Sequence, residues 1–163
     1  MMVKTNYDSP LGQLTLASDG EAIIGLWIEG QKYFAAGIPT NLPVRDDLPV
    51  FLQARGWLDR YFAGKRPAVC ELPLAPQGSA FRQSVWTILC QIPYGHTVTY
   101  GEIAKRLGCK SAQAVGGAVG HNPISIIIPC HRVLGADRGL TGYAGGMDKK
   151  IWLLRHEGAA FRE

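Results

Sequence analysis

The first thirty residues alternate between polar and apolar positions in a way that predicts a small antiparallel sheet. Residues 3–7 and 13–18 alternate along their length, and residues 8–12 between them contain the proline and glycine of a turn. Asp19-Gly20 turns the chain again before the apolar segment 22–29. We therefore predict a β-meander in which residues 22–29 are apolar enough to be a central, buried strand.

A helix is predicted next, because apolar residues recur at helical spacing between residues 50 and 61. Asp46 or Asp47 can cap its start, and Gly64 ends it. An amphipathic helix buries such a face, so we interpret the stripe as core rather than as a ligand site. Its members are Val50, Ala54, Trp57, Leu58 and Tyr61.

The chain changes character near residue 77. Residues 70–74 are predicted to form a further strand, and residues 76–78 read as a linker. We expect residues 1–76 to form a lobe with a small antiparallel sheet and a helix, and residues 77–163 to form a mostly helical lobe. The fold class is then α/β in the α+β arrangement, and the first lobe carries no chemical motif.

Capping residues mark the starts of three helices in the second lobe. Ser79 precedes the first, whose apolar stripe consists of Phe81, Val85, Leu89 and Ile92. Thr99 and Glu102 form a capping-box pattern, in which each side chain satisfies the other residue's backbone amide. Ser111 caps residues 112–121 after a short turn, so the last two helices have the form of a helix-turn-helix.

The second helix of that pair consists mostly of small residues, whereas a major-groove reader needs long polar side chains. Residues 112–120 read AQAVGGAVG, and each interior glycine costs about 1 kcal/mol relative to alanine. Two explanations stay open: tight helix packing inside the protein, or close approach of the helix to a narrow minor groove.

The last forty residues contain three further features. The apolar run 126–128 is predicted to be a buried β segment, and residues 139–146 hold four glycines that let backbone amides approach a ligand. Asp148 is expected to cap a final helix, residues 149–156. Glu157 lies at its end, where the helix dipole disfavours a carboxylate, so we expect a cationic partner, either a surface residue or a histidine at a reactive site.

Composition narrows the class of protein. The chain has 163 residues, of which 47% are hydrophobic and 18% charged, as in an ordinary globular domain. No segment approaches the roughly 20 apolar residues of a membrane span, and the N-terminal residues show no apolar signal-peptide region. We therefore expect a cytoplasmic protein. Its net charge of +4 permits an anionic partner without indicating nucleic acid by itself.

The pair Cys130-His131 is the candidate reactive centre. The other three cysteines are spaced too irregularly for a zinc motif, and a reducing compartment argues against disulfides. Cysteine is a nucleophile only as the thiolate, which a neighbouring base or positive charge promotes. His131 and Arg132 follow Cys130 directly and can supply the base or the positive charge. A buried structural cysteine is the alternative interpretation.

Several sequence blocks together resemble one family. They are Asn122-Pro123, IIIPCHRV at residues 126–133, GYAGG at 142–146 and WLLRHEG at 152–158. They resemble the O6-alkylguanine-DNA alkyltransferases, also called methylated-DNA–protein-cysteine methyltransferases, densely over residues 79–158 and loosely over the first lobe. The resemblance implies direct-reversal DNA repair.

The resemblance implies that a guanine alkylated at O6 rotates out of the duplex and gives its alkyl group to Cys130. The implied activation path runs from Cys130 through a water to His131 and then Glu157, and Tyr100 protonates the departing guanine at N3. Asn122 is the implied hinge between the recognition helix and the active site. The thioether product is not reversed, so each molecule acts once, with no metal or cofactor expected.

The resemblance also implies how the base and the duplex bind. Tyr143 packs on the flipped base, the Ala144 amide faces O6, and the carbonyls of Cys130 and Val133 accept from the exocyclic amine; Val119 is assigned to the same set. The implied partner is double-stranded DNA, bound by a monomer through the minor groove, with cooperative binding along DNA left open. The implied DNA contacts are Thr99, Tyr100, Lys110, Ser111, Ala112, Gln113, Ala114 and Gly117.

Two positions depart from the family pattern. Gln113 stands where relatives usually carry an arginine that fills the gap left by the flipped base. It lacks the charge and stacking plane of guanidinium, so we expect weaker duplex binding or slower extrusion, partly offset by Lys110. Ala144 stands where some relatives carry serine, which predicts a modest effect on substrate range.

Two other functions stay open on the sequence. An alkyltransferase-like protein would only flag damaged bases, although relatives of that kind lack the acceptor cysteine. A cytosolic cysteine hydrolase could use Cys130 and His131, but it would leave the helix-turn-helix without a purpose. O4-alkylthymine is a second candidate substrate, and the sequence does not indicate the preferred alkyl group.

Overall fold

The computed structural model describes residues 1–163 apart from 33, 40, 144 and 163. The chain forms two compact units: Met1–Gln77 together with Pro123–Ile127, and Gly78–Asn122 together with Ile128–Glu163. Both units combine helices with short strands, so the predicted α+β class is confirmed. No helix among the described residues is both long and apolar enough to cross a bilayer.

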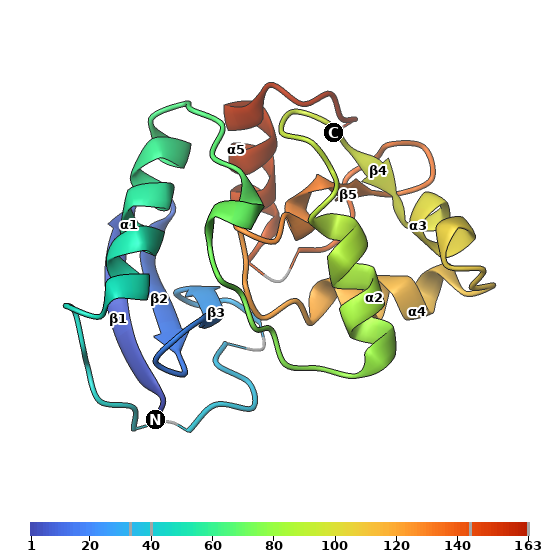
Figure 1. Ribbon diagram of the computed structural model, residues 1–163. Coiled ribbons are helices and arrows are strands. Elements are labelled where there is room, and N and C mark those ends of the chain that lie inside the picture. The colour runs from blue at the N-terminus through green and yellow to red at the C-terminus, as the bar shows by residue number, and fades with distance from the viewer. Residues whose placement is uncertain (33, 40, 144, 163) are drawn as a thin grey trace. The chain divides into compact units, whose positions relative to one another are not determined.

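The sheet of the first unit is the predicted meander. Strands β1 (Val3–Ser9), β2 (Gly12–Ser18) and β3 (Ile23–Ile28) pair antiparallel in that order (Figure 1). Every residue of β3 is buried, as its apolar sequence predicts. Gly25 is required there, because a Cβ at this position would lie 2.0 Å from the Trp27 ring.

The second edge of β3 is paired only at single points. Ile23 forms an isolated bridge with Leu74, and Leu26 forms another with Ile124. Residues 22–29, predicted to be apolar enough for a central strand, are thus flanked by β2 on one edge and by these bridges on the other, while β2 is the middle strand of the meander. The bridge to Ile124 explains why Pro123–Ile127 belongs to the first unit although it lies far beyond residue 77 in sequence.

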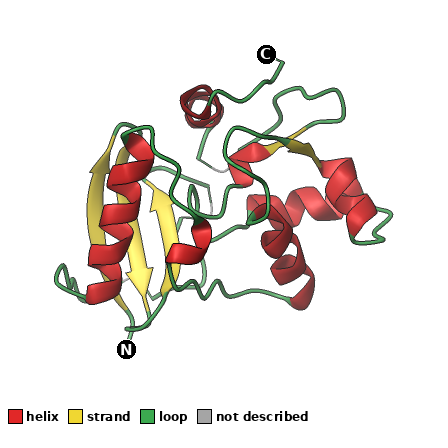
Figure 2. Ribbon diagram, turned by 45° about the horizontal axis from the view of Figure 1, so that its top comes forward, coloured by secondary structure: helices red, strands yellow, loops and turns green. Residues whose placement is uncertain are grey.

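Helix α1 (Pro49–Phe62) packs across the sheet and buries the predicted apolar stripe (Figure 2). Neither Asp46 nor Asp47 caps it, because the N-cap residue is Leu48 and no side chain bonds there. Pro49 at the first helical position explains the difference: it has no N–H to satisfy, and its fixed φ already suits a helix. Asp46 instead accepts a hydrogen bond from the Thr5 hydroxyl at 2.6 Å.

Four helices form most of the second unit: α2 (Ala80–Leu89), α3 (Tyr100–Arg106), α4 (Ala112–Gly120) and α5 (Met147–Glu157). A short parallel pair, β4 (Val98–Thr99) and β5 (Val133–Leu134), joins the start of α3 to the segment that follows Cys130 (Figure 1). Buried Trp86 of α2 donates its indole N–H to the Ala118 carbonyl of α4 at 2.9 Å, which fixes these two helices together.

The predicted caps of α2, α3 and α4 are confirmed. The hydroxyls of Ser79, Thr99 and Ser111 accept from the backbone N–H three residues on, at 3.2, 3.1 and 3.0 Å. The reciprocal half of the capping box is different: the Thr99 hydroxyl donates to the Glu102 carboxylate at 3.3 Å, so this side chain bonds the hydroxyl rather than the amide of Thr99.

Four local predictions are wrong. Residues 69–71 form a 3₁₀ turn instead of starting a strand, because the Glu71 carboxylate accepts from the Ala68 N–H at 2.7 Å. Phe81, in the first turn of α2, is 37% exposed and lies outside the core stripe. Asp148 does not cap α5, which begins one residue earlier, after Gly146. The run 126–128 is buried but turns instead of forming a strand, with Ile126 at a φ of 71°.

Candidate active site

Cys130 opens a buried 3₁₀ turn, Cys130–Arg132, directly after Pro129. Its N–H donates to the Ile128 carbonyl at 2.8 Å, and the Asn122 side-chain amide donates to the same carbonyl at 2.9 Å. Asn122 also hydrogen-bonds the Cys130 thiol. Because the Asn122 N–H bonds the Val119 carbonyl at 3.2 Å, this residue connects the end of α4 to the cysteine turn.

The Cys130 side chain is neutral at rest. Burial raises the pKa of its thiol, and the hydrogen bond from Asn122, the charge of Lys150 and the hydrogen bond from Tyr143 oppose that rise without cancelling it. A thiol of this kind is a poor nucleophile until a base removes its proton. The site therefore needs a neighbouring base, and the adjacent histidine is placed to serve.

His131, Arg132 and Glu157 form a buried group that we call the charge cluster. His131 Nε2 lies 2.6 Å from one Glu157 oxygen, and Arg132 donates to both oxygens, at 2.7 and 3.0 Å. Arg132 also donates to the Ile92 carbonyl at 2.7 Å. Glu157 is the last residue of α5, and these donors offset the unfavourable field of the helix C-terminus.

The cluster holds the negative charge of Glu157, the positive charge of Arg132 and a neutral imidazole. Burial alone would raise the pKa of Glu157, but His131 and Arg132 together hold it well below its usual range. Burial lowers the pKa of His131, and Glu157 opposes this only in part. An ionised Glu157 accepts the proton on Nε2, so the lone pair of His131 is on Nδ1. Among the described residues, Nδ1 has no hydrogen-bond partner.

Tyr100, Tyr143 and Val133 also come together at this site. Burial raises the pKa of the Tyr100 phenol, a hydrogen bond from Thr141 lowers it, and a thiolate on Cys130 raises it. Tyr143 bonds the thiol, and Val133 is the buried first residue of β5. Ala144 lies outside the described residues.

The helix pair α3 and α4 carries most of the predicted DNA contacts. Thr99 is buried and Tyr100 half-buried, whereas the remaining members are exposed: Lys110, Ser111, Ala112, Gln113, Ala114 and Gly117. Val119, assigned to base binding, is buried in the core. A Cβ on Gly117 would meet nothing within 4 Å, so packing inside the described structure does not require this glycine.

Two family models match the chain. The ribonuclease-like domain of 6-O-methylguanine DNA methyltransferase matches residues 2–76, and the DNA binding domain of the same enzyme matches residues 80–159. The chain belongs to the 6-O-methylguanine DNA methyltransferase family.

Similar proteins extend over nearly the whole of this methyltransferase chain. The methylated-DNA–protein-cysteine methyltransferase of Haemophilus influenzae is 49% identical, over 94% of this chain and 84% of its own. The protein of that name from Methanosarcina acetivorans is 44% identical, over 94% and 96%. The crystal structure of Mycobacterium tuberculosis OGT in complex with DNA has a TM-score of 0.83 and 43% identity, covering 94% of this chain and 91% of that one.

Sequence reasoning misses two residues at the site of this methyltransferase. Lys150 is fully buried on α5, and its ammonium donates to the Val133 carbonyl at 2.7 Å and the Thr141 carbonyl at 3.5 Å. Burial lowers its pKa to about 8, although a thiolate on Cys130 raises it in part. Thr141 bonds Tyr100. Neither has a local signal, because a helical lysine and a loop threonine are ordinarily exposed.

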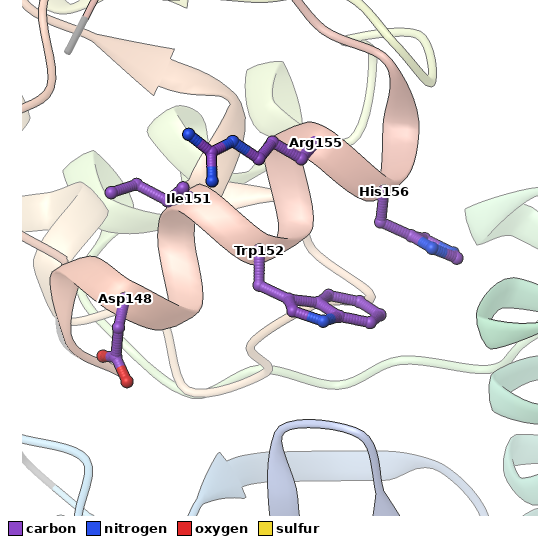
Figure 3. Close-up of a pocket in the computed structure, with 5 residues that line it drawn as sticks. All are labelled: Asp148, Ile151, Trp152, Arg155 and His156. Atoms are coloured by element: carbon purple, nitrogen blue, oxygen red, sulfur yellow. The ribbon is translucent and has the colours of Figure 1, made fainter.

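A separate hollow of about 480 Å³ lies along α5 of the methyltransferase. Its lining residues are Asp148, Ile151, Trp152, Arg155 and His156, drawn in Figure 3. The rings of Trp152 and His156 stack at 4.8 Å. The lining of this hollow contains none of the predicted site residues.

Proposed function

We propose that Cys130 of this methyltransferase removes the alkyl group from O6-alkylguanine in DNA, once per molecule. The observation that carries the proposal is a buried thiol next to a buried neutral imidazole, whose other nitrogen is held by an ionised carboxylate. The protein thus acts in direct-reversal DNA repair, and DNA is its partner.

The first step is removal of the thiol proton. His131 Nδ1 takes the proton of Cys130 through a bridging water, as expected when the two residues are adjacent in sequence. Glu157 stabilises the imidazolium that forms, because it already accepts from Nε2 at 2.6 Å. Arg132 keeps Glu157 ionised and in place, so the arginine acts on the chemistry only through the carboxylate.

The second step is displacement of the base. The thiolate of Cys130 attacks the alkyl carbon, so an S–C bond forms while the C–O6 bond breaks. Tyr100 gives its phenolic proton to N3, and the guanine leaves as a neutral molecule, which is a far better leaving group than its anion. The product is a thioether, for which the chain contains no reversing group.

The base reaches this site by rotating out of the duplex. We propose that α4 lies against the minor groove, where the exposed small residues Ala112, Ala114 and Gly117 permit close approach. Tyr143 then packs on the base, and the Cys130 and Val133 carbonyls accept from the amine. Val119 shapes this pocket from the core, and Thr99, Lys110 and Ser111 bind the flanking backbone.

Intact-mass measurement tests the proposal. After incubation with a duplex that contains O6-methylguanine, the protein should gain the mass of one methyl group, and Cys130→Ala should gain none. Binding without any mass change would instead favour a damage-recognition protein, and turnover of ester substrates would favour a cysteine hydrolase. Action on O4-alkylthymine, a monomeric state, cooperative DNA binding and a cytoplasmic location stay predictions.

A further inference from the structure

Thr141, in the glycine-rich loop, contacts three parts of the second unit. Its hydroxyl donates to the phenolic oxygen of Tyr100 at 3.1 Å. Its carbonyl accepts from Lys150 Nζ at 3.5 Å, and that ammonium also donates to Val133 at 2.7 Å. Its methyl group lies close to Gly135, because a Cβ on that glycine would be 3.1 Å from it. The backbone and both branches of the side chain are therefore held.

We propose that Thr141 is a positioning residue for Tyr100: its hydroxyl donates to the phenolic oxygen and leaves the phenolic proton directed toward the bound base. This inference rests on the proposed function, in which Tyr100 protonates N3 of the departing guanine. Thr141 touches neither the base nor the alkyl group in that step, so it acts only through Tyr100.

The hydrogen bond has a defined effect on the proton transfer. As the guanine leaves, the O–H bond of Tyr100 breaks, an N3–H bond forms, and a phenolate is left behind. Burial makes this phenolate costly, because water solvates its charge poorly there. A donor on the phenolic oxygen stabilises the developing charge, and accordingly Thr141 lowers the pKa of Tyr100.

The side-chain geometry makes the test specific. Valine has the shape of threonine and keeps the methyl contact near Gly135, but it cannot donate a hydrogen bond. Serine keeps the hydroxyl and loses only the methyl group. The pair Thr141→Val and Thr141→Ser therefore separates the hydrogen bond from the packing of the loop.

Single-turnover transfer from an O6-methylguanine duplex, measured at saturating protein, tests the inference. We expect Thr141→Val to be roughly three- to tenfold slower, the range for loss of one hydrogen bond, with a duplex dissociation constant within about twofold of wild type. Thr141→Ser should transfer within about twofold of the wild-type rate. If valine destabilises the loop, seen as a lower melting temperature, Thr141→Ala compared with Thr141→Ser repeats the test without the second methyl group.

A double-mutant cycle with Tyr100→Phe separates positioning from general loop damage. Tyr100→Phe should lose about a hundredfold or more in rate, as for loss of a general acid, and Thr141→Val should add no further loss in that background. A wild-type rate in Thr141→Val, or an equal loss with and without the Tyr100 hydroxyl, would overturn the inference. Failure of the wild-type protein to methylate Cys130 at all would instead overturn the proposed function.

Discussion

The charge cluster and the exposed face of α4 are built in opposite ways. In the cluster, Glu157 accepts from one ring nitrogen and two guanidinium nitrogens, and all three residues are buried. On α4, Gln113 is exposed, and open space surrounds the position of a Gly117 Cβ. The cluster fixes its own geometry, whereas the helix face leaves room for a partner. Substitutions in the cluster should therefore affect folding and chemistry together, and those on the exposed face of α4 should change DNA handling without loss of stability.

Glu157→Gln should have the largest effect. It leaves Arg132 buried without its counter-charge, which costs about 3–5 kcal/mol of unfolding free energy. It also removes the group that stabilises the His131 imidazolium, so methyl transfer should slow by about a hundredfold or more. Chemical denaturation and single-turnover kinetics measure the two losses. A variant that keeps full stability would show that the cluster does not fix its own geometry.

Two controls sharpen this prediction. Asp47→Asn breaks an exposed ion pair with Arg45 and should cost less than about 1 kcal/mol. The second control compares the stability of the two proteins as the pH is lowered. The pKa of Glu157 is lowered in the folded protein, so its stabilisation is present above the unfolded value near 4.5 and lost as pH falls toward the folded value. The stability gap between wild type and Glu157→Gln should therefore narrow below about pH 4.5, and a constant gap would contradict this account.

Lys150→Met tests a second buried charge, which donates to two backbone carbonyls. The folded pKa of Lys150 is about 8 against an ordinary 10.5, so the unfolded chain binds more protons between these values and stability rises with pH across them. In a Cys130→Ala background, which removes the thiol titration from the same range, the rise is on the order of 3 kcal/mol at most. Thermal melting at pH 7 and pH 10 should show this rise when Lys150 is present, and the Lys150→Met variant should not show it.

Lys150→Met should also slow methyl transfer near neutral pH when Cys130 is present. The ammonium lowers the pKa of the thiol, so its removal leaves less thiolate. The rate should recover in part as pH rises, because more alkaline solution restores the thiolate without the lysine. A loss that stays constant with pH would indicate that the lysine only holds the Val133 and Thr141 carbonyls.

The same contrast explains what the sequence can predict. The caps at Ser79, Thr99 and Ser111 follow from bonds between residues three apart, which a local pattern contains. The predicted cap of α1 is wrong because Pro49 makes a capping side chain unnecessary. The run 126–128 is wrongly predicted to be a strand, because an apolar sequence indicates burial but does not distinguish a strand from a buried turn.

At the site, the sequence indicates Cys130 through its adjacent histidine, and the family resemblance adds Glu157. The contacts of Arg132 with Glu157, 25 residues away, and of Lys150 with Val133, 17 residues away, depend on how α5 packs against the cysteine turn. No periodicity in the chain encodes these distances. The sequence therefore indicates candidate reacting groups, whereas the long-range contacts around them emerge only from the packing of the fold.

Gly117→Ala should separate stability from DNA binding. Alanine in a helix interior is favoured over glycine by about 0.5–1 kcal/mol, and the added methyl meets nothing within 4 Å, so the protein should become more stable. If α4 lies against DNA, the same methyl should weaken duplex binding several-fold. Gly56→Ala on α1 is the matched control, since its Cβ also meets nothing, and it should stabilise the protein without changing DNA binding.

Gln113→Arg should have the smallest effect and tests whether α4 is already adapted to its partner. A guanidinium can stack and make charge-assisted hydrogen bonds in the gap left by the flipped base, so transfer from duplex DNA should speed up by roughly two- to fivefold. Gln113→Lys adds the charge without the planar group and should gain less in rate, although both variants should steepen the salt dependence of binding by about one phosphate contact. Equal gains in rate for arginine and lysine would show that the added positive charge alone causes the effect. No gain, or a loss, with arginine would show that glutamine already fills this role. The exposed face of α4 would then be as specifically adapted to DNA as the residues of the charge cluster are to one another.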